Sequence, residues 1–207
     1  MGLKQLIIAA ALLTAGTLTA SAQFEAGAKI GFGAHWIART AMKGNEDTRP
    51  HNGYYGGIFA TYTIHDAFLI QAEALYASKG HSDRNKFDGK YSRDLRYINV
   101  PIYLGYKFND RFSLMAGPEF GFLTGCTVRE EDVRHDGMDD CNRFDFGIAA
   151  QFTVMFSERI GLNLSGNYSI TRTFDIPYQP DPNVQPVQDE GRNAGFQLGI
   201  CYKFVVD

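Results

Sequence analysis

The sequence predicts an all-β fold, an eight-stranded antiparallel transmembrane β-barrel of the up-and-down type. Eight stretches of alternating apolar and polar residues follow a secretion signal. In all eight stretches the apolar residues occupy even-numbered positions. The connections between the stretches alternate between short and long, which is the asymmetry of outer-membrane barrels with short periplasmic turns and long extracellular loops.

The first 22 residues have the pattern of a cleavable secretory signal. A basic start at Lys4 precedes an apolar run over residues 6–13, and Ala20-Ser21-Ala22 precedes Gln23. A single membrane anchor is disfavoured because this apolar run is too short to span a bilayer. We therefore expect a signal peptide over residues 1–22 and one outer-membrane β-barrel domain over residues 23–207.

The first alternating stretch shows why lipid, and not a second sheet, is expected against the apolar face. Ile30, Phe32 and Trp36 alternate with Gly31 and Gly33, and a period of two places the two sets on opposite faces of a strand. Small residues suit the crowded interior of a small barrel, whereas bulky aromatic residues are suited to lipid. The other stretches run over residues 54–64, 68–76, 98–106, 112–122, 144–156, 160–170 and 194–204. No later segment offers the roughly 20 continuous apolar residues of a membrane helix, so a closed barrel is the way for this chain to cross a membrane.

The short connections form an internal repeat of three residues with a central acid: 65–67, 109–111 and 157–159. This length fits a hairpin built on a type I turn. An odd-length turn brings residues of equal parity opposite one another, which explains the constant even face. The long connections are expected over residues 38–53, 80–94, 124–142 and 172–192, and the fourth is expected to be irregular because it holds four prolines.

Outward aromatic residues gather at both ends of the strands, which predicts two girdles at the membrane interfaces. The predicted girdle residues are Trp36, Tyr54, Tyr62, Phe68, Tyr76, Tyr106, Phe112, Phe122, Phe144, Phe156, Tyr202 and Phe204.

The odd, inward set is polar, and an eight-stranded barrel is just wide enough for its side chains to fill it. Lys79, Asn99, Gln151 and Asn167 belong to this set. The predicted polar network of the lumen consists of Lys29, Glu73, Lys107, Glu119, Arg143, Asp145 and Lys203. The two glutamates could form an acid/base pair, but the cationic neighbours favour a structural ion-pair network.

The cysteines and the acidic loop give two further expectations. Cys126 and Cys141 bracket one predicted loop of an exported chain, which makes a disulfide between them the expected pairing, while Cys201 should face the lumen unpaired. Neither the cysteine spacing nor a nearby histidine pair suits zinc, so no metal site is expected. The acidic residues of the third long loop match no EF-hand spacing and are read as a solvated loop. They are Glu130, Glu131, Asp132, Asp136, Asp139 and Asp140.

Specific stretches go beyond alternation. Residues 97–108 read YINVPIYLGYKF and residues 117–123 read GPEFGFL, and the chain also carries Phe144-Asp145-Phe146-Gly147 and Tyr202-Lys203-Phe204. Together they resemble the PorT-type outer-membrane β-barrel family of small porin-like or OmpA-like barrels, over essentially the whole mature chain. The resemblance implies the fold and the location, and its members range from porin-like proteins to a barrel tied to protein secretion. The mid-strand prolines, Pro101 and Pro118, are expected to mark a bulge or kink.

From these observations we expect a barrel of the bacterial outer membrane that is not an enzyme, holds no cofactor and acts in envelope structure or through its loops, with a role in secretion as an extension. A small porin and a membrane-embedded lipid-modifying enzyme are the alternatives. Ser165 and Ser169 lie far along the chain from His35, so the signal for a nucleophilic site is weak. The expected partners are outer-membrane lipid, the barrel assembly machinery during biogenesis, and an envelope or secretion protein. A formal net charge of −3 leaves no basic footprint for nucleic acid, and a monomer is expected.

Overall fold

A computed structural model describes residues 23–39, 48–64, 67–85, 89–130, 133–138, 141–178 and 187–205. The predicted signal peptide over residues 1–22 lies outside the described residues and stays a prediction. No helix in the described part of the chain is long and apolar enough to cross a membrane.

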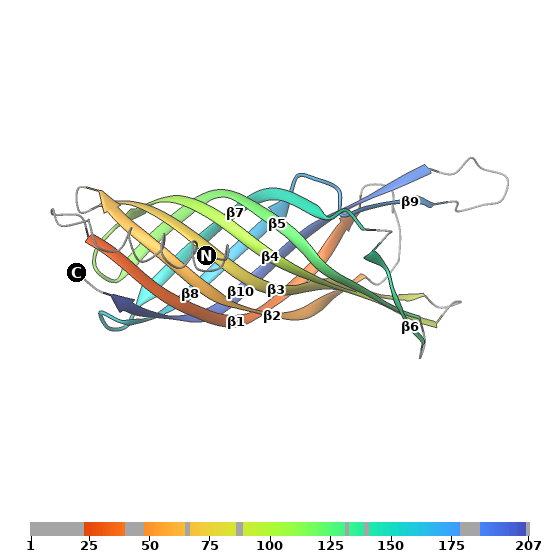
Figure 1. The fold of residues 1–207 in the computed structure, drawn as a ribbon, viewed down its shortest axis with the longest axis horizontal. Helices are drawn as coiled ribbons and strands as arrows, with labels where there is room; N and C mark the ends of the chain where they lie inside the picture. Colours follow the sequence, from red (N-terminus) through yellow and green to blue (C-terminus); the bar gives the residue numbers. More distant parts are fainter. Residues whose placement is uncertain are drawn as a thin grey trace, which may run out of the picture.

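Eight long antiparallel strands form a closed barrel (Figure 1). Consecutive barrel strands pair along the chain, and β1 pairs with β10 to close the cylinder. The barrel strands are β1 (Gln23–Arg39), β2 (Thr48–Ile64), β3 (Phe68–Asn85), β4 (Gly89–Lys107), β5 (Phe112–Glu130), β7 (Phe144–Met155), β8 (Ile160–Ser169) and β10 (Val187–Val205). The predicted fold class is therefore confirmed.

The even and odd faces separate as the alternation predicts. Ile30 and Phe32 are 71% and 78% exposed, whereas Lys29 and His35 in the same strand are 5% and 3% exposed. The large exposed apolar residues of the barrel strands are all even-numbered, whereas the buried set is mainly odd-numbered and about half of it is polar or charged. The apolar face thus lies on the outside of the cylinder and the polar face on the inside, the arrangement of a barrel in lipid.

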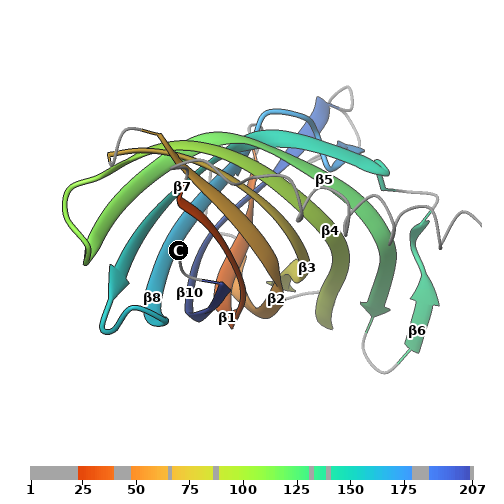
Figure 2. The same ribbon diagram turned by 60° about the vertical axis from the view of Figure 1, so that its left-hand side comes forward.

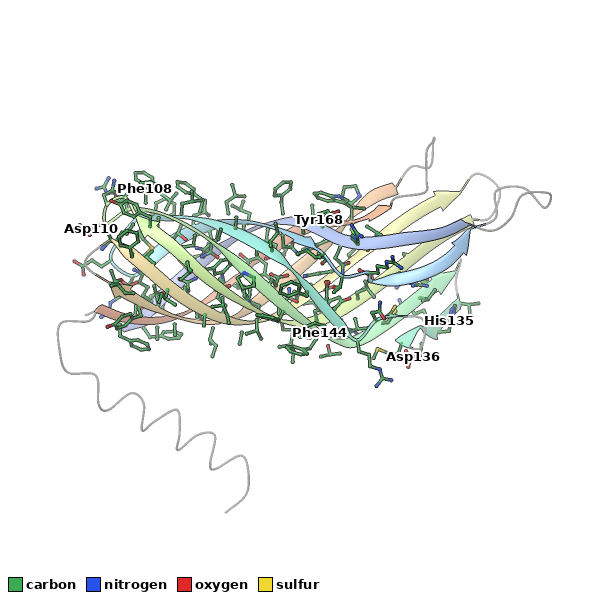
Figure 3. The ribbon with its side chains drawn as sticks, turned by 90° about the horizontal axis from the view of Figure 1, so that it is seen from above. Phe108, Asp110, His135, Asp136, Phe144 and Tyr168 are labelled. Atoms are coloured by element: carbon green, nitrogen blue, oxygen red, sulfur yellow. The ribbon has the colours of Figure 1, made fainter. Side chains whose placement is uncertain are left out.

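The short turns close the barrel at one end. Asn109 Oδ1 accepts the backbone N–H groups of Arg111 and Phe112, at 2.9 and 3.0 Å. Ser157 Oγ does the same for Ile160 at 3.1 Å. In Figure 3, Phe108 and Asp110 lie at this end, while His135 and Asp136 lie at the opposite end. A side-chain acceptor at the first turn position is the local cause of these hairpins.

The long connections contain more strand than the sequence predicts. β3 continues to Asn85 and pairs with β4 from Gly89. A short strand, β6 (Val133–Asp136), pairs with the end of β5 beside the barrel wall (Figure 2). Another, β9 (Phe174–Tyr178), pairs with the start of β10, so the expectation of an irregular fourth loop is wrong for these residues. A proline is tolerated in β9 because edge strands need fewer ladder donors.

One extra residue in β5 shifts the register at the loop end. Tyr97 pairs with Leu123, but the preceding Arg96 pairs with Gly125, which leaves Thr124 as a bulge. The even-numbered Cys126 therefore turns inward beyond this point and is buried.

The mid-strand prolines cause no shift of register, so the expected bulge does not form there, although the β4–β5 ladder is interrupted between Pro101 and Leu104. Val100 pairs with Phe120, Pro101 with Glu119 and Leu104 with Ala116, all in one register. The ladder on either side of each proline holds the strand in place despite the missing donor.

Candidate functional site: the polar lumen and the outer rim

A first network crosses the middle of the lumen. Lys29 of β1 forms an ion pair with Glu73 of β3 and donates to Gln151 of β7 at 2.6 Å. Gln71 also donates to Glu73 and accepts from Thr61 at 2.7 Å. The side chains of Lys29 and Glu73 are 2% and 0% exposed. A buried charge pair of this kind is held by neutral donors and acceptors from several strands.

A second network lies one step toward the loops and converges on one carboxylate oxygen. Glu119 Oε1 accepts from Lys79 at 3.0 Å and from Asn99 and Asn167 at 3.3 Å each. These donors come from β3, β4 and β8, so Glu119 of β5 connects strands across the interior. The Lys79 ammonium also lies 5.4 Å from the Tyr97 ring centre. Odd parity places all of these residues inside, and this placement follows from the sequence.

A third network surrounds Asp145. Ser169 and Thr171 each donate to this carboxylate at 2.8 Å, and Asn193 donates at 3.0 Å. Asn193 of β10 also reaches the hydroxyl of Tyr97 in β4 at 3.4 Å, across the barrel. Asn193 and Thr171 are not among the predicted network residues, although their odd-numbered positions were the signal that could have identified them.

The turn end carries two ion pairs, of which Lys203–Glu25 is partly buried, and one small cavity. Lys203 pairs with Glu25 at 2.6 Å, and Lys107 pairs with Asp110 at 2.9 Å. The hydrogen bond and charge of Lys107 lower the pKa of the exposed Asp110 carboxyl. The cavity has a volume of about 50 Å³ and is lined by these lysines and by Lys29. It has room for little more than ordered water.

Two residues of the predicted lumen network lie elsewhere. Arg143 is exposed at the loop end, because it lies in the bend before β7, where the alternation has not begun. Lys107 is only partly buried, because it ends β4 and turns to Asp110 of its own turn.

The two cysteines of the predicted disulfide meet under the third long connection. Their Sγ atoms lie 2.9 Å apart as thiols, buried with Leu95, Tyr97 and Val128. The hydrogen bond between the thiols raises the pKa of Cys126, and burial acts in the same direction. The disulfide itself stays a prediction. Cys201 is buried inside the wall near Met155, far from this pair in the fold.

The predicted girdle residues lie on the outer face, and several contact one another. Near the turns, the ring centres of Phe68 and Tyr106 are 5.5 Å apart. Near the loops, those of Phe122 and Phe144 are 5.7 Å apart. Trp36, which is partly exposed, packs on Phe196 at 5.7 Å. The remaining members are all exposed on the same face: Tyr54, Tyr62, Tyr76, Phe112, Phe156, Tyr202 and Phe204.

No nucleophilic triad forms among the described residues. The hydroxyl of Ser169 donates to Asp145, and that of Ser165 lies 3.4 Å from Gln197. His35 is buried, and its Nδ1 atom has no hydrogen-bond partner. No cluster of three metal-ligating side chains occurs in the described part of the chain either. Most of the acidic residues of the third long loop lie outside the described part of the chain. Asp136 is described and is exposed on β6.

Comparison with known proteins agrees with this geometry. The model of the outer membrane protein β-barrel domain family matches residues 18–175. Ail of Yersinia pestis, in complex with the heparin analogue sucrose octasulfate, is 13% identical with a TM-score of 0.50, over 88% of this chain and 99% of that chain. Neisserial surface protein A is 12% identical with a TM-score of 0.50, over 89% and 100%. OprG from Pseudomonas aeruginosa is 15% identical with a TM-score of 0.46, over 88% and 95%.

A search of curated proteins finds no significant match to the chain. The structural similarities concern the fold, and the family match covers most of the sequence. The chain therefore belongs to the outer membrane protein β-barrel domain family and is a small barrel of the bacterial outer membrane.

Proposed function

We propose that this barrel has a sealed lumen and acts through its outer strands and loops in the cell envelope, without conducting solutes and without catalysis. The observation that carries the proposal is the network around Lys29, because one buried ammonium contacts both β3 and β7 through the lumen. Two further polar networks cross the same lumen above it. A solute would have to break several buried charge-assisted hydrogen bonds to pass.

Three features support a role at the loop end. β6 carries four exposed residues outside the barrel wall. The β3–β4 hairpin and β9 extend the sheet in the same direction (Figure 1). Hydrogen-bonded strands that are already formed offer a surface for an envelope protein at low ordering cost.

The resemblance to the PorT-type family supports an association with protein secretion as a narrower form of this proposal. Deletion of the gene in the native bacterium tests it, with secreted proteins measured in the culture medium. Loss of secreted proteins, restored by the wild-type gene, is the expected result. An unchanged secreted set would exclude the secretion role and leave the sealed envelope barrel.

Conductance in planar bilayers tests the sealed lumen. The purified wild-type protein should give no stable openings. The variant Lys29→Ala/Gln151→Ala, which removes the crossing contacts, should conduct measurably more. Phe152→Ala on the outer face of β7 is the matched control. Stable open channels in the wild-type protein would refute the sealed lumen and favour a small porin.

A further inference from the structure

The loop-end rim of β4, β5, β7 and β8 carries exposed arginines directly above the outer girdle. Arg96 of β4 is exposed. It lies two residues before the outward Ile98, on the loop side of that residue. Arg143 is exposed and immediately precedes the outward Phe144. Arg172 is exposed beyond Ile170, whose side chain is 50% exposed. The rim therefore places positive charge next to lipid-facing apolar residues.

Strand pairing and backbone contacts place these arginines on neighbouring parts of the rim. Arg96 pairs with Gly125 of β5, and the carbonyl of Arg143 accepts from Leu123 of the same strand at 2.8 Å. The two arginines flank β5 and so stand about two strand spacings apart, roughly 10 Å. Arg172 follows β8, the strand next to β7, and its carbonyl accepts a hydrogen bond from Asn142 Nδ2 at 2.6 Å. Long arginine side chains at this spacing can reach one phosphorylated headgroup.

The described surroundings leave two of these charges without an acidic partner. Arg96 donates to Thr127 at 3.2 Å, and no carboxylate among the described residues pairs with Arg96 or Arg143. The nearby Asp145 points inward to Ser169. Guanidinium groups at an interface match phosphate geometrically, because they donate two parallel hydrogen bonds.

Below this rim, the same outer face is hollowed by a groove of about 710 Å³. Its floor consists of Ala116, Ala150 and Gly166, which pair across β5, β7 and β8. Tyr168 and Phe196 stand at its side, and Figure 3 labels Tyr168 on this wall. The lining is mostly apolar and faces lipid, so its occupant must be apolar.

The depth of the groove relates it to the rim. Ala150 lies seven positions after Arg143, which is roughly 23 Å along a strand. At a tilt of about 45° this is roughly 16 Å of depth, about half of a hydrocarbon core of roughly 30 Å. A lipid whose headgroup lies at the rim would therefore extend its chains down to the groove.

We propose that this face binds a phosphorylated glycolipid of the outer leaflet. The arginines of the rim hold its phosphate, and an acyl chain occupies the groove over Ala150. Charge at the rim and apolar surface below it match both parts of one amphipathic lipid. A soluble phosphate compound would use only the rim, and an uncharged lipid only the groove.

Native mass spectrometry of the full chain in nanodiscs tests the proposal. The nanodiscs contain phosphatidylcholine with a few per cent of diphosphoryl lipid A, and parallel samples replace lipid A with phosphatidylglycerol. The wild-type protein should retain lipid A in preference to phosphatidylglycerol. Arg96→Gln/Arg143→Gln should reduce retained lipid A about tenfold, which is the factor for about 1.4 kcal/mol.

Variants of the groove provide the second arm. Ala150→Phe fills the floor and should reduce retention several-fold, with Ala116→Leu as a milder replacement if folding fails. Ala74→Phe on the outer face of β3 and Arg134→Gln on β6 are matched controls that should bind as the wild type does. Equal retention by the rim variant and the wild type would overturn the proposal. So would displacement of lipid A by millimolar inorganic phosphate, which would identify a plain anion site.

Discussion

Replacing Glu119 by leucine should destabilise the barrel strongly. The change leaves the Lys79 ammonium and two amide groups without their shared acceptor, at 3.0, 3.3 and 3.3 Å in the native protein. The carboxylate is 12% exposed and the ammonium 1%, so water compensates little. Removing one partner of a buried pair typically costs about 3 to 5 kcal/mol. For a domain of this size, this is a fall of roughly 6 to 20 °C in the unfolding temperature.

The assay is the temperature at which the folded band disappears on unboiled gels, together with urea unfolding in lipid vesicles. Phe120→Leu is the matched control, because Phe120 adjoins Glu119 on the outer face and packs on Phe146 at 5.4 Å. It should cost only about 1 kcal/mol. Glu119→Leu combined with Lys79→Met should recover much of the loss, because no unpaired charge is left inside.

An unfolding temperature for Glu119→Leu within about 2 °C of the wild type would refute this reasoning. So would a larger loss in Phe120→Leu. The first result would mean that water reaches Lys79 freely, so that the lumen is open at this level; the second would mean that packing on the outer face contributes more to stability than the buried ion pair.

Further predictions concern export, oxidation and a turn. Mass spectrometry of the membrane-extracted protein should find Gln23 as the first residue, and an intact start would contradict export. Non-reducing peptide mapping should join Cys126 to Cys141, a bond that stabilises a loop of this length by about 3 kcal/mol on the loop-entropy model; two alkylated free thiols in the exported protein would contradict it. Asn109→Ala should lower the free energy of unfolding by about 1 kcal/mol, because two backbone donors lose their acceptor. Asp110→Ala in the same turn should change it little, and equal losses would show that the turn is held in another way.

The strands and their faces could be predicted because the membrane imposes one simple rule over their length. Lipid on one side and a narrow polar lumen on the other force a strict period of two, visible in Ile30 and Phe32 against Lys29. The three-residue turns were equally visible, because Asn109 and Ser157 are turn formers at fixed offsets.

The rule ends where the membrane ends. β6 and β9 lie on the loop side of the barrel, where no constant alternation marks a strand. Arg143 was placed inside by counting parity through a bend. The partners within the lumen were also beyond the sequence, because Lys79 and Lys29 have equal parity and only the register assigns Glu119 to the first and Glu73 to the second.

The bulge at Thr124 has a consequence for how one strand serves two solvents. On the membrane side of Thr124, β5 presents Phe122 outward, as lipid demands. On the loop side of Thr124 the strand presents Cys126 and Val128 inward, where they join an apolar cluster. This direction keeps them away from the water outside the barrel. A single added residue therefore switches the apolar side chains of this strand from the outer face, as in a membrane barrel, to the inner face, as in a water-soluble protein. Deleting Thr124 would turn both apolar side chains toward water, so the length of this strand, and not only its composition, records where the bilayer stops.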